Sequence, residues 1–137
     1  MYPPELVAPM SKDLTDHGFE GLTTPAAVDQ ALDNQKGTLL LVVNSVCGCA
    51  AGMARPGVKM SLQHEKKPSK ATTVFAGVDA EATARAREYL LPYPPSSPSI
   101  ALFKDGQLVH FIERHHIEGS PAEVIAQNLK MAYDRFC

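Results

Sequence analysis

Four stretches of the sequence carry the hydrophobic pattern of β-strands. The apolar run at residues 38–44 is typical of a central strand that is covered on both faces. Residues 72–78 form a second run that is rich in β-branched and aromatic side chains. Residues 100–103 and 108–112 flank an Asp-Gly pair, which is a strong hairpin signal. We therefore expect four strands, of which the last two are antiparallel neighbours.

Helical signals lie before and after the first of these strands. Thr24 is a capping residue that precedes a proline at the first helical position, so we predict a helix over residues 24–36. A second helix should follow Cys49 and run to about His64. The pair Pro56-Gly57 interrupts its pattern, and a proline there should kink the helix or divide it into two pieces.

Two more helices are expected in the second half of the chain. Asp79 can cap a helix that runs to about Leu90, and the proline-rich segment 92–98 cannot continue it. Ser120 and Glu123 form the pattern of a capping box around a first-turn proline, which predicts the start of the last helix. The apolar stripe of that helix consists of Ile125, Leu129, Ala132 and Phe136.

The elements alternate in the order β-α-β-α-β-β-α. This order predicts an α/β fold with a four-stranded mixed sheet flanked by helices, in which the first two strands are parallel and joined by a right-handed crossover. The chain shows neither an internal repeat nor a linker, so residues 1–137 are expected to form a single domain. Residues 1–36 would be an N-terminal helical extension, because their early prolines favour a short helix or coil lying over the core.

Composition and charge narrow the class of partner. The chain has 137 residues, and its 45% hydrophobic content is enough to bury a core without disulfide or metal crosslinks. A formal net charge of −2 argues against nucleic acid or an anionic membrane surface as a partner. No apolar run approaches the roughly 20 residues of a membrane span, and the N-terminus lacks the pattern of a signal peptide. We therefore expect a cytoplasmic protein that acts on a small molecule or another protein.

Cys47 and Cys49, separated only by Gly48, are the main candidates for chemistry. In the cytoplasm, closely spaced cysteines are more often catalytic, redox-sensing or metal-binding than structural. Because residues i and i+2 of a helix point in nearly opposite directions, this pair can form a disulfide only in a turn or at the first residues of a helix. Gly48 would supply the backbone freedom. A thiol at that junction meets unpaired N–H groups and the helix dipole, which favour the thiolate.

Metal binding is the alternative explanation of the cysteine pair. Thiolates at short spacing bind soft ions such as Cu(I) or Zn(II), but two cysteines leave a tetrahedral zinc site short of ligands. His110, His115 and His116 could complete such a site. Adjacent histidines after a strand are more often polar residues that face the solvent, so we expect no metal site.

Three polar residues lie near the pair in the sequence, namely Asn44, Ser45 and Arg55. They could bind polar parts of a thiol ligand. They are equally well explained as residues at the end of a strand and on the surface of a helix. The sequence leaves both explanations open.

Four segments of the chain resemble the bacilliredoxin family of thioredoxin-like proteins. They are residues 44–50 (NSVCGCA), 74–79 (VFAGVD), 82–87 (ATARAR) and 94–99 (PPSSPS). The resemblance extends over essentially the whole chain and implies a thioredoxin-like fold. It also implies that Cys47 is the attacking thiol and that Cys49 is the resolving thiol.

The same resemblance implies roles for residues outside the cysteine pair. Pro98 would be the cis proline that thioredoxin-like proteins hold beside their active cysteines. The backbone of Ser97 would be free to pair with an extended thiol substrate, and Gly48 would border that substrate. Cys137, the last residue, is either an unpaired terminal thiol or a second resolving thiol.

The function implied by the resemblance is removal of bacillithiol from mixed disulfides on cytoplasmic proteins. The enzyme would need no bound cofactor, and bacillithiol would serve as its low-molecular-weight thiol co-substrate. Two other functions stay open. A protein disulfide isomerase or weak protein oxidant would use the same cysteines, because a tight disulfide is easily reduced. A soft-metal carrier or sensor would not be an enzyme.

Overall fold

Five strands form one mixed sheet in the computed structural model, which describes residues 2–33 and 36–137. Their spatial order is β1-β3-β2-β4-β5. The first three are mutually parallel, whereas β4 runs antiparallel to both β2 and β5. The strands are β1 (Glu20–Gly21), β2 (Thr38–Asn44), β3 (Lys70–Phe75), β4 (Ser99–Lys104) and β5 (Gln107–Ile112).

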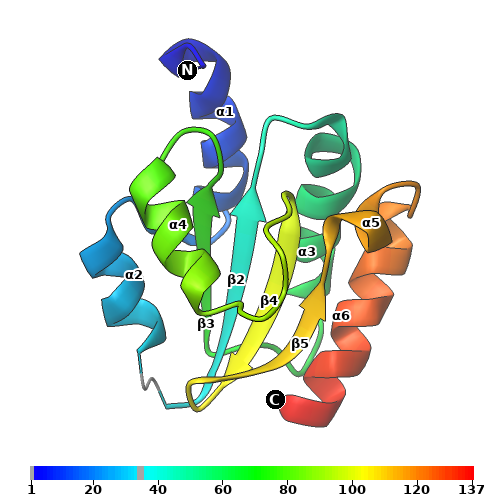
Figure 1. Ribbon diagram of the computed structural model, residues 1–137. Coiled ribbons are helices and arrows are strands. Elements are labelled where there is room, and N and C mark those ends of the chain that lie inside the picture. The colour runs from blue at the N-terminus through cyan, green and yellow to red at the C-terminus, as the bar shows by residue number, and fades with distance from the viewer. Residues whose placement is uncertain (1, 34–35) are drawn as a thin grey trace.

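Helices cover both faces of this sheet (Figure 1). Helices α3 and α6 pack together on one face, and α2 and α4 pack together on the other. The helices are α1 (Pro4–Thr15), α2 (Pro25–Leu32), the π-helix η1 (Ala50–Ala54), α3 (Arg55–Ser61), α4 (Ala80–Glu88), α5 (Arg114–Ile117) and α6 (Ala122–Phe136). Within the described ranges, none of these helices combines the length and the apolar composition that crossing a membrane requires.

The central strand β2 supplies side chains to both hydrophobic layers. Leu40 and Val42 belong to the core beneath α3 and α6, while Leu39, Leu41 and Val43 belong to the core beneath α2 and α4. This alternation is the period of two that a strand imposes on its side chains. All seven residues of β2 are buried, which confirms the predicted central strand.

The fold class is confirmed as α/β with a mixed sheet, but the predicted number of strands was one too few. The additional strand β1 has only two residues, Glu20 and Gly21, which pair with Thr72 and Thr73 of β3. So short a strand has no hydrophobic period. The N-terminal 36 residues therefore add an edge to the sheet as well as the helix α1. The helix expected over residues 24–36 ends at Leu32, and positions 34–35 lie outside the described residues.

Pro56 lies where the helical segment after the cysteine pair divides into two pieces, as expected. The chain runs from the π-helix η1 directly into α3, where Pro56 occupies the first turn. An N–H group is not needed at that position, and the wider π-turn before it accommodates the proline ring. A Cβ atom on Gly57 would lie 2.8 Å from a side-chain carbon of Ile125, so the glycine permits close packing of α3 against α6.

The turn predicted from the Asp-Gly pair is confirmed, whereas the capping box predicted for the last helix is not. Asp105 and Gly106 have φ angles of 51° and 81°, the left-handed conformation that a tight hairpin of this type requires. The capping box predicted at Ser120 is wrong: Pro121 occupies the N-cap of α6, and Ser120 Oγ donates instead to the carbonyl of His116 at 2.8 Å. The hydroxyl thus closes the preceding short helix α5.

Candidate active site

The cysteine pair lies where β2 ends and the helix η1 begins. Cys47 and Cys49 are joined by a disulfide bond, with their Cα atoms 5.3 Å apart. Cys49 has a relative exposure of only 8%, whereas Cys47 is half-buried and borders a surface pocket. An incoming thiol therefore has access to the sulfur of Cys47 and not to that of Cys49.

Backbone groups of the first helical turn surround Cys47. The N–H group of Cys49 donates to Cys47 Sγ at 3.4 Å. The N–H groups of Ala50 and Ala51 both bond the Cys47 carbonyl oxygen, at 3.0 and 3.2 Å. The pair thus occupies the first residues of a helix, as its spacing required. Such N–H groups and the helix dipole stabilise a thiolate, which forms when the disulfide is reduced.

Gly48 does not serve as the source of backbone freedom that the sequence suggested. Its φ angle lies outside the left-handed region, and a Cβ atom added to it would have no neighbour within 4 Å. Gly48 is exposed and takes part in the helical turn that begins the following helix. The glycine leaves open space beside the disulfide. That Gly48 borders the substrate stays a prediction.

Arg114 contacts the sulfur of Cys47 directly, a contact that no local pattern around Arg114 predicts. Its Nη2 atom lies 3.3 Å from Cys47 Sγ, and its Nη1 atom donates to the Ser97 carbonyl oxygen at 3.1 Å. Its Nε atom pairs with Glu118 one turn further along. A capping box formed by Glu113 and His116 fixes the start of α5 and hence the position of Arg114. The guanidinium places a positive charge where a Cys47 thiolate would develop.

The Ser97–Pro98 peptide bond is cis, as predicted. Pro98 is buried, and Ser97 is half-buried on the rim of the same pocket as Cys47. The Ser97 carbonyl already accepts one hydrogen bond from Arg114, and its pairing with an extended thiol substrate stays a prediction. A peptide substrate at this position would share the carbonyl with Arg114.

Cys47 opens into a pocket of about 340 Å³. Its wall contains two cationic side chains, Arg87 and Arg114, but no carboxylate. The remaining lining residues are Tyr2, Ser45, Val46, Ala76, Gly77 and Ser97. A larger pocket of about 590 Å³ lies between residues 89–93 and 106–111 and contains none of the cysteines.

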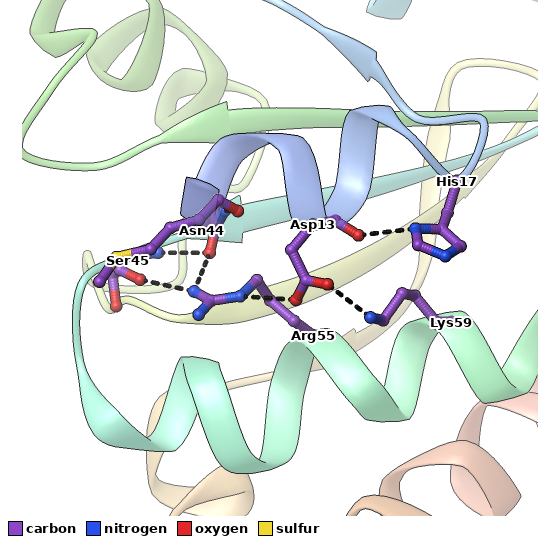
Figure 2. Close-up of polar contacts among 7 residues, drawn as sticks. Asp13, His17, Asn44, Ser45, Arg55 and Lys59 are labelled. Atoms are coloured by element: carbon purple, nitrogen blue, oxygen red, sulfur yellow. Dashed lines mark hydrogen bonds and ion pairs between the residues drawn. The ribbon is translucent and has the colours of Figure 1, made fainter. Parts of the chain in front are cut away.

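A buried arginine of α3, Arg55, holds the end of β2 that leads to the cysteine pair (Figure 2). Arg55 is 5% exposed, and its Nη1 atom donates to Asn44 Oδ1 at 3.0 Å and to the Ser45 carbonyl at 3.1 Å. Asn44 in turn donates to the Met10 carbonyl of α1 at 3.2 Å and accepts from the Ser45 N–H at 2.9 Å. All three residues are therefore buried, and their hydrogen bonds hold the backbone that leads to Cys47. Ser45 in addition lines the pocket, so a contact between Ser45 and a thiol ligand stays a prediction.

Asp13 of α1 neutralises this buried arginine. Its carboxylate accepts from Arg55 Nε at 3.1 Å and from Lys59 Nζ at 2.5 Å, so that it bridges α1 and α3 (Figure 2). Burial by itself raises the pKa of Asp13, but the hydrogen bonds and charges of Lys59 and Arg55 outweigh it, and the net pKa is lowered. The N-terminal helix thus contributes a charge to the support of the active-site loop.

Cys137 lies at the opposite end of the sheet from the cysteine pair. The C-terminus of α6 is near the beginning of β2, whereas Cys47 follows the end of that strand (Figure 1). The seven residues of β2 span about 20 Å. Partial burial raises the pKa of the Cys137 thiol, which is the wrong direction for a nucleophile at neutral pH. The structure therefore does not bring Cys137 to Cys47, and a resolving role within the same molecule does not fit this arrangement.

The histidines considered as metal ligands do not form a cluster of ligand atoms with the cysteine pair among the described residues. In the described part of the chain, the one group of three close metal-ligand atoms is Glu113, His115 and His116, and it contains no cysteine. His116 Nδ1 accepts from the Glu113 N–H at 3.3 Å in the cap of α5. His110 bonds Asn128 at 2.6 Å. These contacts give the histidines roles in the fold.

The chain matches a family profile described as Disulphide isomerase over residues 2–137. A bacilliredoxin of Cytophaga hutchinsonii is 64% identical over 134 residues, which cover 98% of both chains. A bacilliredoxin of Halalkalibacterium halodurans is 54% identical over 136 residues, covering 99% of this chain and 94% of the relative. These matches include the cysteine pair, both pocket arginines and Pro98 within the aligned span.

Solved structures with the same fold include thioredoxins. Mitochondrial thioredoxin 3 of Saccharomyces cerevisiae, in its oxidised form, superposes with a TM-score of 0.60 at 18% identity, covering 90% of this chain and 98% of the other. The thioredoxin of Fasciola hepatica gives a TM-score of 0.59 at 17% identity, with coverage of 87% and 100%. At such identities the likeness shows the thioredoxin fold.

Proposed function

We propose, from the premise that this chain is a thiol–disulfide oxidoreductase of the bacilliredoxin family, that it removes bacillithiol from mixed disulfides on cytoplasmic proteins. Support comes from the unequal exposure of the two cysteines: Cys47 borders the pocket, and Cys49 is 8% exposed. The exposed sulfur of Cys47 is placed to exchange with thiols from outside, and the buried sulfur of Cys49 is placed to attack only Cys47, within the molecule.

The reaction consists of two exchanges between thiolates and disulfides. The Cys47 thiolate attacks the sulfur of bacillithiol, so the bond from bacillithiol to the substrate cysteine breaks and the substrate leaves as a thiolate that takes a proton from water. Bacillithiol is then bound to Cys47. The Cys49 thiolate next attacks Cys47 Sγ, bacillithiol leaves as a thiolate, and the disulfide forms. The mixed disulfide is thereby reduced while two enzyme thiols are oxidised.

The structure corresponds to the last state of this sequence. Regeneration needs two thiol molecules from solution, which reduce the disulfide and leave as their own disulfide, so bacillithiol serves as the co-substrate and no bound cofactor is required. Arg114 Nη2 and the Cys49 N–H both lie close to Cys47 Sγ and stabilise negative charge on it. These groups make Cys47 the better leaving group and the better nucleophile at neutral pH.

Protein disulfide isomerisation is the second candidate, because the matching family profile carries that description. An isomerase attacks a disulfide between two protein cysteines and must release the mixed disulfide before its own resolving thiol acts. Only the substrate differs from the first proposal. Comparing the rates on a bacillithiolated protein and on a protein with scrambled disulfides separates the two functions.

The decisive experiment uses the reduced protein and single-cysteine variants, with intact-mass analysis after mixing with a bacillithiolated protein. Cys47→Ser should take up no bacillithiol, whereas Cys49→Ser should accumulate bacillithiol on Cys47. Cys137→Ser serves as the matched control and should behave like the wild type, because Cys137 lies at the far end of β2. Uptake by Cys47→Ser would reverse the assignment of the two cysteines, and the absence of uptake by both variants and the wild type would refute the substrate.

A further inference from the structure

We propose that Arg87 and Arg114 form a binding site for an anionic group, such as a carboxylate, on the small thiol that exchanges with Cys47. The proposal deepens the exchange reaction described above and rests on it. On this proposal, the enzyme selects among low-molecular-weight thiols by the attraction between the two guanidinium groups and an anionic group on the thiol. Arg87 is the residue that defines this site, since its side chain has no partner among the described residues.

The side chain of Arg87 has no partner in the described parts of the chain. Its Nε atom is buried without a hydrogen bond, although the side chain as a whole is half-buried. No ion pair or hydrogen bond to the Arg87 side chain is present among the described residues, whereas its backbone carbonyl accepts from the Leu90 N–H group within the helix end. A buried N–H group without an acceptor costs free energy, which a ligand with an acceptor oxygen can recover.

The pocket gives such a ligand a specific place. Arg87 and Arg114 line it together with Cys47, and no aspartate or glutamate does so. Its volume of about 340 Å³ is at the lower end of the range for small-molecule sites. A thiol joined to the Cys47 sulfur would therefore extend into a cavity whose charged lining is entirely positive.

The two arginines differ in how many of their N–H donors the protein already uses. Arg114 already contacts Glu118, the Ser97 carbonyl and Cys47 Sγ. Among the described residues, no protein acceptor uses a side-chain donor of Arg87. A guanidinium presents parallel N–H groups that match the two oxygens of a carboxylate, so Arg87 is suited to that group in particular.

The neighbouring Arg85 provides a matched control on the same helix. Its Nε atom donates to Asp29 at 2.6 Å, and its Nη1 atom donates to Glu88 at 2.6 Å. It does not line the pocket. Replacing Arg85 or Arg87 by Gln removes the same charge from α4, but only the second change affects the proposed site.

The test measures the rate at which small thiols reduce the oxidised enzyme. A thiolate attacks Cys47 Sγ, the disulfide breaks, and Cys49 leaves as a thiolate. The probes are 3-mercaptopropionate, which carries a carboxylate, and 2-mercaptoethanol, which is neutral. Each rate is divided by the concentration of the thiolate form and by the rate at which the same thiol reduces a small-molecule disulfide. The intrinsic reactivity of the two thiols then cancels from the comparison. The wild type should favour mercaptopropionate, and Arg87→Gln should lose about tenfold of that preference, as expected for one charge-assisted hydrogen bond.

Three further measurements decide the outcome. Arg85→Gln should keep the wild-type preference, and Arg87→Lys should keep part of it. The wild-type preference should also fall as salt is raised from about 0.05 to 1 M, a readout that does not depend on any variant folding. An equal preference in the wild type and Arg87→Gln would overturn the site. A wild type that favours the anionic thiol but ignores bacillithiolated protein would refute the proposed substrate and leave the site standing.

Discussion

Two arginines lie beside the cysteine loop, and they differ in whether the protein satisfies them. Arg55 is 5% exposed and bonds Asp13, Asn44 and the Ser45 carbonyl. Arg87 is half-buried in the wall of the pocket, and its buried Nε atom has no acceptor. A guanidinium that donates to three protein acceptors holds the backbone in place, whereas one without side-chain partners among the described residues is available to a ligand.

Desolvation explains why the two environments have to differ in this way. A charge that is removed from water needs protein partners, and removing one partner of a buried ion pair costs several kcal/mol. The loop before Cys47 thus gains rigidity from Arg55. The pocket side retains a cation that is stabilised only when an anion enters, which links affinity to the charge of the thiol.

The largest expected effect is on stability and separates the two arginines directly. Arg55→Met removes the arginine donor from the Ser45 carbonyl and leaves Asn44 Oδ1 with the Ser45 N–H group, and it takes one cation from Asp13. We expect it to lower the free energy of unfolding by about 3 kcal/mol. Arg87→Met loses no protein partner and should change it by less than about 0.5 kcal/mol. Urea denaturation of both variants measures the difference. Equal losses would show that Arg87 is also a structural residue.

Arg114 resembles Arg55 in having protein partners and resembles Arg87 in lining the pocket, and it also contacts the reacting sulfur. Arg114→Met in the Cys49→Ser background should raise the pKa of the Cys47 thiol and slow its alkylation near pH 7 by about tenfold. Iodoacetamide rates measured against pH provide the test. Glu118→Gln keeps the guanidinium and is the control. An unchanged pH profile in Arg114→Met would mean that the backbone N–H groups alone stabilise the thiolate.

Asp13 tests whether the charge behind Arg55 matters. The folded protein lowers its pKa from the ordinary value of 3.8, so the carboxylate stabilises the fold above that value and this contribution is lost as the pH falls through the folded pKa. Asp13→Asn should therefore cost about 1 kcal/mol at pH 7, a modest amount because the carboxylate is partly solvated. Near pH 3 the difference should shrink. Denaturation curves at both values would show the same loss if charge were irrelevant.

Gly48 lies in the cysteine loop itself and should have the smallest effect. A Cβ atom at this position meets nothing within 4 Å, and the backbone is not left-handed. Gly48→Ala should raise the free energy of unfolding by about 0.5 kcal/mol, since alanine restricts the unfolded chain. Thermal unfolding of the oxidised protein measures it. A clear loss of stability would reveal a backbone constraint that the geometry does not show.

Local sequence signals predicted the parts of the molecule that depend on neighbours in the chain. The strand at 38–44, the turn at Asp105-Gly106 and the cysteine pair at a helix start all follow from a few adjacent residues. The family resemblance added the cis bond before Pro98. The strand β1 was missed because two residues are too few to show the alternation of apolar and polar side chains that identifies a strand.

The charged surroundings of the site could not be predicted in the same way. Arg114 is 67 positions from Cys47 in the sequence, and Arg55 is 42 positions from Asp13. Both contacts exist only because the sheet and the helices on its faces bring distant segments together. A single sequence shows which arginines it contains but not which of them has a carboxylate beside it. That distinction separates Arg55 from Arg87.

The position of Cys137 makes the oxidised protein convenient to attach to other materials. All three cysteines lie in the described ranges, and with Cys47 and Cys49 joined, Cys137 is the free thiol and is exposed. A maleimide dye or a coated electrode would therefore react at one end of β2, about 20 Å from the pocket. Molecules immobilised through this residue would all present their redox centre outward, which suits an oriented sensor for small thiols.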